Sequence, residues 1–368
     1  MDGIANDIAR HSLGATQSKG QRIEYIDCMR GFTMILVVYH HVVYYFLSNG
    51  AEEVTNFDSI IMSFRMPLFF FISGLMACRL HVDSGWLREK CRRRLLEQFM
   101  PTVVVGVLYV LFIHHDLRNL LFDSAREGYW FTITLFEVFV CYAVVSYVLD
   151  RLKLNTLAKD LFFVGIMFLM CLCFVLSLTS RPFATSAFSQ IFGLYQFVKF
   201  LPLFLLGVLA KMYFPRFSAI AGNNIVASLA LLLFVVLCVL RQVRPDMPFV
   251  GATQSLQAIL GIVMVYKVFY SYRDFFSANT KVGRCLSHVG KHTLPIYLLH
   301  FFFVSGLMGL KNTNLPALIS DSWSFELFFV FLCSLLIVGA TLLVDKFLGA
   351  FPLLHSIMLG WKTRKGST

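Results

Sequence analysis

The chain has 368 residues, of which 58% are hydrophobic and only 14% are charged. This composition excludes a disordered chain, a collagen and a coiled coil, and a soluble globule with so much apolar surface would not stay dissolved. The 32 basic and 21 acidic residues give a net charge of +11, which in a membrane protein indicates basic cytoplasmic loops rather than a nucleic-acid partner. The sequence therefore predicts an all-α, polytopic integral membrane protein.

Apolar stretches long enough to cross a bilayer as helices recur ten times along the chain. Basic residues in the connecting segments divide into 23 on the side of the two chain ends and six on the opposite side. The positive-inside rule therefore places both termini in the cytoplasm. The predicted spans lie near residues 30–47, 60–80, 99–115, 129–149, 161–179, 191–213, 224–241, 251–270, 293–311 and 324–347.

This pattern of spans divides the chain into three parts. We expect a polar cytoplasmic segment over residues 1–21, a membrane domain over 22–347 and a short basic cytoplasmic tail over 348–368. The nine cysteines include no Cys-x-x-Cys pair and lie mostly inside apolar runs, where cysteine acts as a small hydrophobe. We therefore expect neither a metal site nor a disulfide framework.

The first span contains two ionisable residues that share one helix face. Ionisable side chains inside a bilayer are costly, so each marks a candidate functional position. Arg30 and His41 are eleven residues apart, which places them on one line about 16 Å apart along the helix axis. Histidine exchanges protons near neutral pH, and a positioned base contributes about 10²–10⁴ in rate. We expect His41 to act on a group that enters past Arg30; the alternative is an anchoring Arg30 and a packing His41.

The segment between the second and third spans is predicted as a loop over residues 79–98 and is densely basic. Six basic residues lie between residues 79 and 94, and guanidinium groups in such number can hold phosphates. The alternative is that they only anchor lipid headgroups and set the topology. The candidate phosphate-binding residues are Arg88, Lys90, Arg92, Arg93 and Arg94.

Later spans carry further polar groups at membrane depth. Glu137 is the only carboxylate deep in a predicted span, and it can orient His41, bind a substrate hydroxyl, or pair with Lys199 or Arg65. Arg65 can bind substrate or cap a helix end, and Lys199 can neutralise Glu137 or bind an acidic sugar. His300, with Tyr297 one turn before it on the same helix face, can line the active site or pack against its neighbours.

Six motifs in order give the chain a resemblance to a known family. Together they resemble acyltransferase family three, integral-membrane enzymes that move acetyl or other acyl groups onto sugars and glycans. The resemblance covers about residues 22–347. The motifs are Arg30-Gly31 with an apolar run to His41, Arg65-Met-Pro-Leu-Phe-Phe-Phe-Ile-Ser73-Gly74, the basic stretch ending Arg94-Leu95-Leu96, Gly128-Tyr-Trp130-Phe131, Leu201-Pro-Leu-Phe-Leu-Leu-Gly207, and Val289-Gly290-Lys291-His292-Thr293-Leu294-Pro-Ile296-Tyr297-Leu-Leu-His300.

The resemblance implies an essential pair and a donor. The first-span Arg and His of the family match Arg30 and His41, and the donor is typically acyl-CoA reached from the cytoplasm, with no bound cofactor. The family usually has Arg-x-x-Arg before Leu-Leu. Here the chain departs from that pattern, because Lys90 stands three residues before Arg93 and Cys91 three before Arg94.

These observations predict a membrane-embedded O-acyltransferase in the cell membrane of a bacterium. It would move an acyl group, most simply acetyl from acetyl-CoA, to a hydroxyl of a sugar, polysaccharide or glycolipid. His41 would serve as base or transient acyl carrier. The expected catalytic residues are His41, Arg30 and Glu137, the donor-binding residues Arg88, Lys90, Arg92, Arg93 and Arg94, and the substrate-binding residues Arg65, Trp130, Lys199 and His300.

A transporter is the alternative from another functional class. A proton-coupled transporter or flippase of a lipid-linked glycan or a small acid would use mid-membrane His, Glu and Lys side chains as a proton relay. Membrane lipids are partners in either case, and the oligomeric state stays open.

Overall fold

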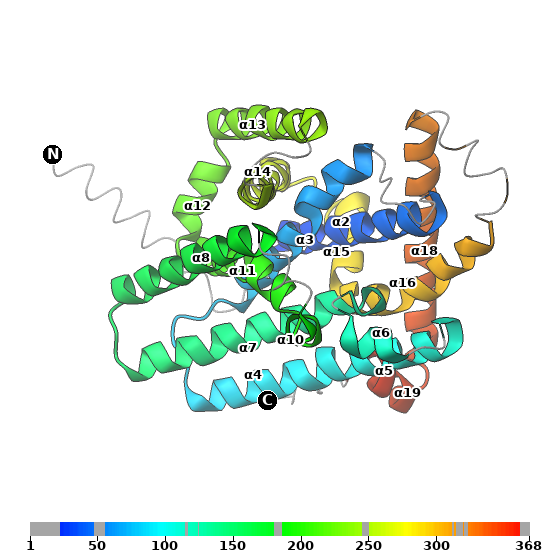
Figure 1. Ribbon diagram of the computed structural model, residues 1–368, viewed down its shortest axis with the longest axis horizontal. Helices are drawn as coiled ribbons and strands as arrows, with labels where there is room; N and C mark the ends of the chain where they lie inside the picture. Colours follow the sequence, from blue (N-terminus) through cyan, green and yellow to red (C-terminus); the bar gives the residue numbers. More distant parts are fainter. Residues whose placement is uncertain are drawn as a thin grey trace.

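The computed structural model describes residues 23–47, 56–114, 117–123, 125–179, 186–244, 250–310, 313, 319 and 323–360. Within these ranges the protein is helical and has no strands (Figure 1). The predicted N-terminal segment 1–21 and residues 361–368 of the predicted tail lie outside the described residues.

Ten helices are long and apolar enough to cross a membrane, which confirms the predicted number of spans. Both the all-helical class and the multi-pass architecture follow from this, whereas the orientation of the termini stays a prediction. The spanning segments are α2 (Glu24–Val42) with η1 (Val43–Leu47), α3 (Asn56–Ala77), α4 to η3 (Ser84–His114), α7 (Trp130–Arg151), α8 (Thr156–Thr179), α11 (Leu194–Met212), α13 (Asn224–Val243), α14 (Val250–Ser271), α16 (Thr293–Leu307) with η5 (Met308–Leu310), and α18 (Trp323–Leu348).

Short helices connect these spans, and one more follows the last span. They are α6 (Leu117–Phe122), η4 (Arg126–Gly128), α10 (Ala187–Ile191), α12 (Phe214–Ala221), α15 (Lys281–Lys291) and α19 (Pro352–Leu359). The last of them belongs to the predicted basic tail, and it packs against α5 and α16.

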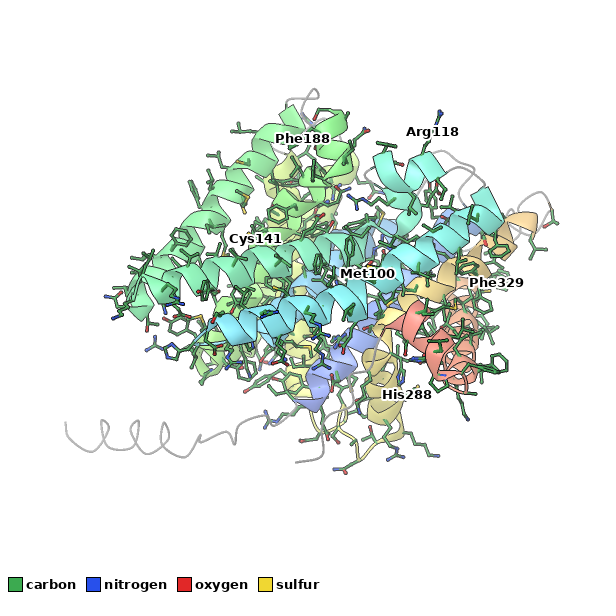
Figure 2. The ribbon with its side chains drawn as sticks, turned by 90° about the horizontal axis from the view of Figure 1, so that it is seen from below. Met100, Arg118, Cys141, Phe188, His288 and Phe329 are labelled. Atoms are coloured by element: carbon green, nitrogen blue, oxygen red, sulfur yellow. The ribbon has the colours of Figure 1, made fainter. Side chains whose placement is uncertain are left out.

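The basic segment after the second span is helical, so the prediction of a loop over 79–98 is wrong from Ser84 onward. α4 (Ser84–Arg94), η2 (Leu95–Phe99), α5 (Met100–Tyr109) and η3 (Val110–His114) form one long helix beside α7 (Figures 1 and 2). Asp83 caps its first turn, because its carboxylate accepts a 2.8 Å hydrogen bond from the backbone N–H of Trp86. Leu, Arg, Glu and Lys are strong helix formers, so the helix begins well before the apolar run.

The first span, α2, is the central helix of the bundle. It contacts α3, α14, α15, α16 and α18, and nearly all of its residues are buried. Peripheral helices instead expose large apolar side chains; Phe168 of α8 and Phe328 of α18 are 72% and 67% exposed, as expected for surfaces that face lipid. The polar side chains of α2 therefore meet protein rather than lipid.

Glycines of the sequence motifs mark the closest helix contacts. A Cβ atom at Gly31 of α2 would lie 2.0 Å from the carbonyl oxygen of Leu286 in α15, and one at Gly290 would lie 2.0 Å from that of Asp27. Small residues let two backbones approach in this way. Gly31 and Gly290 thus fix α15 against the segment that carries Arg30.

Candidate active site

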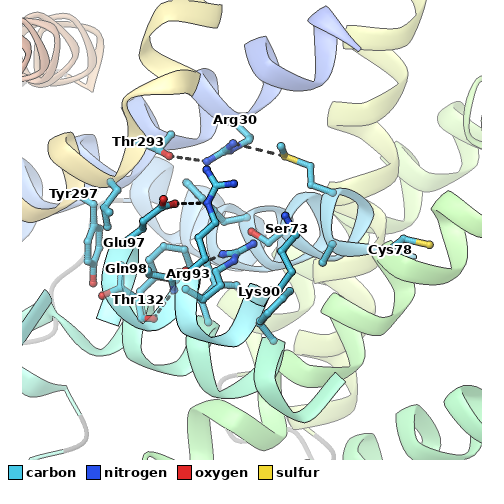
Figure 3. Close-up of a pocket in the computed structure, with 18 of the residues that line it drawn as sticks. Arg30, Ser73, Cys78, Lys90, Arg93, Glu97, Gln98, Thr132, Thr293 and Tyr297 are labelled. Carbon is cyan, nitrogen blue, oxygen red and sulfur yellow. Dashed lines mark hydrogen bonds and ion pairs between the residues drawn. The ribbon is translucent and has the colours of Figure 1, made fainter. Parts of the chain in front are cut away.

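Arg30 lies on the wall of a cavity of about 490 Å³ (Figure 3). Its Nη2 donates a 2.8 Å hydrogen bond to the hydroxyl of Thr293 at the start of α16, and its Nη1 donates to the sulfur of Met76 at 3.6 Å. These contacts hold the guanidinium of Arg30 against the cavity wall. The alternative of a purely anchoring Arg30 therefore fits the geometry less well.

The cavity is strongly basic at the end where Arg30 lies. Five cations line it, and the one carboxylate among its lining residues is Glu97, which accepts a 2.8 Å hydrogen bond from Nε of Arg93. The guanidinium of Arg94 lies 4.6 Å over the ring of Phe139 and donates to Gln98. An excess of positive charge in a concave site suits a phosphorylated ligand. The five cations are Arg30, Arg79, Lys90, Arg93 and Arg94.

Only part of the predicted phosphate-binding set lines this cavity. Lys90, Arg93 and Arg94 lie on one face of α4, because residues three and four apart are neighbours on a helix. Arg88 and Arg92 lie on the other side of the helix, where both are exposed, and they are not among the lining residues. The cavity therefore brings together three of the five predicted donor-binding residues and leaves Arg88 and Arg92 outside it.

Tyr297 of α16 closes the inner end of the cavity together with Phe69 and Phe131. Its hydroxyl donates to the carbonyl of Gly128, and its ring centroid lies 5.2 Å from that of Phe131. On its other side, the ring centroid of Tyr297 lies 5.8 Å from that of His300. Tyr297 thus stands between the basic cavity and the interior histidines.

The interior histidines form a directed hydrogen-bond chain. Nδ1 of His300 lies 2.7 Å and 3.1 Å from the carbonyl oxygens of Tyr297 and Ile296, and its Nε2 lies 3.0 Å from Nδ1 of His41. Carbonyl oxygens only accept, so Nδ1 of His300 carries its proton, and Nε2 of a neutral His300 accepts from His41. This assignment leaves the Nε2 lone pair of His41 available as a proton acceptor.

His40 belongs to a second, separate polar pair. Its Nδ1 lies 2.8 Å from a carboxylate oxygen of Asp58, and both side chains are buried. His40 therefore ties α2 to the beginning of α3, next to the ring of His41 at a centroid distance of 5.3 Å. The sequence analysis did not identify this pair; the acidic Asp58 beside an apolar run was the available signal.

Glu137 lies neither in the orienting position beside His41 nor in an ion pair with Lys199 or Arg65 in the described residues, and its binding to a substrate hydroxyl stays a prediction. Burial lowers the pKa of the Arg126 guanidinium, and the nearby Glu137 carboxylate opposes that shift, so Glu137 faces η4. The orienting position beside His41 is occupied by His300 instead.

Of the remaining predicted residues, Arg65 and His300 lie near His41, and Lys199 lies within electrostatic range of Arg65. Arg65 is buried, with 7% of its surface exposed, and it interacts electrostatically with His41 and His300. Trp130 stacks on Phe200 at a centroid distance of 5.4 Å. Arg65, Lys199 and His300 are therefore brought to one region by three different helices.

Two further site residues are Thr293, which was not predicted from the sequence, and Tyr297, which was predicted only as a neighbour of His300. Both lie in the motif that enters α16, and both line the cavity, as do Gln98 and Thr132, which are joined by a 2.7 Å hydrogen bond (Figure 3). Their place in a motif was the available signal for Thr293 and Tyr297. No sequence signal marked Gln98 or Thr132, because isolated polar residues at span ends are common.

Comparison with known proteins gives one match. A family model described as an acyltransferase domain matches residues 23–345. No curated protein matches the chain, and no solved structure does. The matched range contains Arg30, His41, His300 and the whole cavity lining.

Proposed function

Since the chain belongs to this acyltransferase family and is a multi-pass membrane protein, we propose that it transfers an acyl group from acyl-CoA to an acceptor hydroxyl. The acyl group is most simply acetyl, and the acceptor is a sugar, polysaccharide or glycolipid. The observation that carries the proposal is the His41–His300 pair directly behind a basic cavity. We place the protein in the cell membrane of a bacterium, with the basic cavity facing the cytoplasm.

The basic cavity is the proposed donor site. Arg30, Lys90, Arg93 and Arg94 are available for the phosphates of CoA, because charge-assisted bonds from such groups are the usual means of holding phosphate. Its volume of about 490 Å³ is typical of sites that bind small molecules. The acyl thioester would lie at the inner end, beside Tyr297.

In the proposed reaction, His41 is the general base. Its Nε2 takes the proton of the acceptor hydroxyl while the hydroxyl oxygen attacks the thioester carbonyl carbon, and the carbon–sulfur bond breaks to release the CoA thiolate. The proton on Nε2 then passes to that thiolate, giving free CoA and the ester. His300 accepts from Nδ1 of His41 throughout, so it stabilises the imidazolium that forms in between.

The Nε2 lone pair of His41 also permits a second route. In this route Nε2 attacks the thioester first, and His41 carries the acyl group transiently. The direct route requires acceptor before any carbon–sulfur bond breaks, whereas the carrier route forms an acylated His41 without acceptor. Intact-protein mass spectrometry after mixing with acetyl-CoA alone distinguishes them. We expect no acylated protein.

The test of the proposed function measures CoA release. Purified protein in detergent, with no membrane potential, should slowly convert acetyl-CoA to free CoA with water as the acceptor, and a His41→Ala variant should lose about 10²-fold or more of that rate. His81→Ala is the matched control, because the His81 side chain is 90% exposed and lies outside the cavity. Wild-type protein that releases no CoA but moves a glycan across proteoliposomes would instead support the transporter.

A further inference from the structure

Arg65 is a buried cation that leaves two of its three guanidinium nitrogens without a hydrogen bond in the described residues. Its Nε and Nη1 are buried and have no hydrogen-bond partner among the residues the structure describes. Buried polar groups are normally satisfied, and a buried guanidinium without partners is costly. These two nitrogens can therefore donate hydrogen bonds to a bound ligand.

Lys199 of α11 is a second cation of this kind. Its ammonium lies 5.4 Å from the ring centroid of Phe200 and 5.6 Å from that of Phe174. In the described ranges of the chain it makes no hydrogen bond and no ion pair. Aromatic faces stabilise an ammonium partly, but they exclude water and so strengthen its attraction for an anion.

The two cations lie within electrostatic range of each other, and α3 packs along α11. Lys199 interacts electrostatically with both Arg65 and Arg241, so the group is like-charged. Asp58 binds His40, and Glu137 faces Arg126. Asp58 also lies within electrostatic range of Arg65 and offsets part of this charge, but one carboxylate does not balance the three cations Arg65, Lys199 and Arg241. A like-charged group in a membrane protein interior marks a ligand site.

The position of the pair separates it from the donor cavity. The cavity touches α3 at Phe69, Ser73, Met76 and Ala77, whereas Arg65 lies one turn earlier in α3, toward its Asp58 end. Arg65 also interacts electrostatically with His41. A ligand held by Arg65 would therefore lie beyond the part of α3 that lines the donor cavity, within electrostatic range of His41.

We propose that Arg65 and Lys199 bind an oxyanion, a carboxylate or a phosphate, on the acyl acceptor, so that the acceptor is an acidic glycan. This inference rests on the proposed acyl transfer, because it assigns the acceptor for that reaction. The anion would orient the acceptor and bring its hydroxyl to Nε2 of His41. Two charge-assisted bonds predict that an anionic acceptor binds about tenfold or more tightly than its neutral counterpart.

The test uses three alkyl glycosides that differ only at one carbon: a glucoside, a glucuronide and a glucoside 6-phosphate. Their binding to the full-length protein in lipid nanodiscs is measured without acyl-CoA, by thermophoresis. We expect the glucuronide or the phosphate, or both, to bind about tenfold or more tightly than the glucoside. The stronger of the two identifies the anion. Equal binding of all three would overturn the proposal.

Two variants of α11 sharpen the test. Lys199→Met should reduce binding of the anionic glycosides to the level of the glucoside, whereas Lys211→Met, the same change near the end of the helix, should keep the preference. Removing an unpartnered buried charge should leave the thermal midpoint unchanged or raised. A large drop in the midpoint for Lys199→Met would overturn the proposal, because it would mean that the charge is already satisfied within the protein.

Arg65→Gln separates acceptor binding from chemistry. We expect it to slow transfer to the anionic glycosides more than transfer to the glucoside, because only the anionic glycosides lose a charge-assisted bond. Equal losses with water and with every glycoside would assign Arg65 to the reaction centre and overturn its role in acceptor binding. Failure of the proposed function would appear separately, as absence of CoA release from wild-type protein that still binds the glycosides.

Discussion

Nε2 of His300 lies 3.0 Å from Nδ1 of His41, although 259 residues separate the two in the chain. The backbone carbonyls of Ile296 and Tyr297 hold the proton of His300 on the opposite nitrogen. The direction of the hydrogen bond between the histidines is set by this arrangement. His41 therefore presents a lone pair on Nε2 without help from a carboxylate.

Replacing His300 should impair the chemical step more than donor binding. We expect His300→Ala to lower kcat about ten- to a hundredfold with little change in the KM for acetyl-CoA, because His41 loses the group that orients it. The pH–rate profile should change as well, since His300 no longer stabilises the imidazolium. A variant with wild-type kcat and an unchanged profile would show that His300 only packs.

The two faces of α4 should respond differently to loss of charge. Lys90→Met and Arg93→Met should each raise the KM for acetyl-CoA about tenfold, because a charge-assisted bond to phosphate is lost. Arg88→Met and Arg92→Met, on the exposed side of the same helix, should change it less than about twofold. Steady-state kinetics of the four variants measure this. Similar effects on both faces would indicate general electrostatic attraction rather than contact.

The glycine contacts between α2 and α15 should be sensitive to a single methyl group. Gly290→Ala would place a Cβ atom 2.0 Å from the carbonyl oxygen of Asp27, so we expect a loss of about 1–3 kcal/mol and a lower thermal midpoint. Gly339→Ala in α18 is the control, because a Cβ atom there meets nothing within 4 Å. Equal midpoints for the two variants would contradict the close packing.

The Asp58–His40 pair should stabilise the junction of α2 and α3. Asp58→Ala leaves a buried imidazole without its partner, and removal of one member of such a pair typically costs about 3–5 kcal/mol. We expect a lower thermal midpoint in detergent. The double variant Asp58→Ala/His40→Leu should recover part of the loss, because neither polar group is then stranded; no recovery would argue against a direct interaction.

The sequence by itself determined the membrane class, the number of spans and the alignment of Arg30 with His41. Length, apolar runs and helix periodicity are local properties, so they need no knowledge of which helix lies beside which. The same locality explains the error at residues 84–98. An apolar-run criterion detects the membrane layer but not a polar helix that continues beyond it.

Only the tertiary structure decided which polar groups meet. Glu137 was a reasonable partner for His41 from its depth in a span, yet the rotation of α7 turns it to Arg126, and α16 brings His300 to His41 instead. The face of α4 that lines the cavity likewise separates Lys90 and Arg93 from Arg88 and Arg92. Depth along one helix is a sequence property, but the rotation of each helix follows from packing against its neighbours.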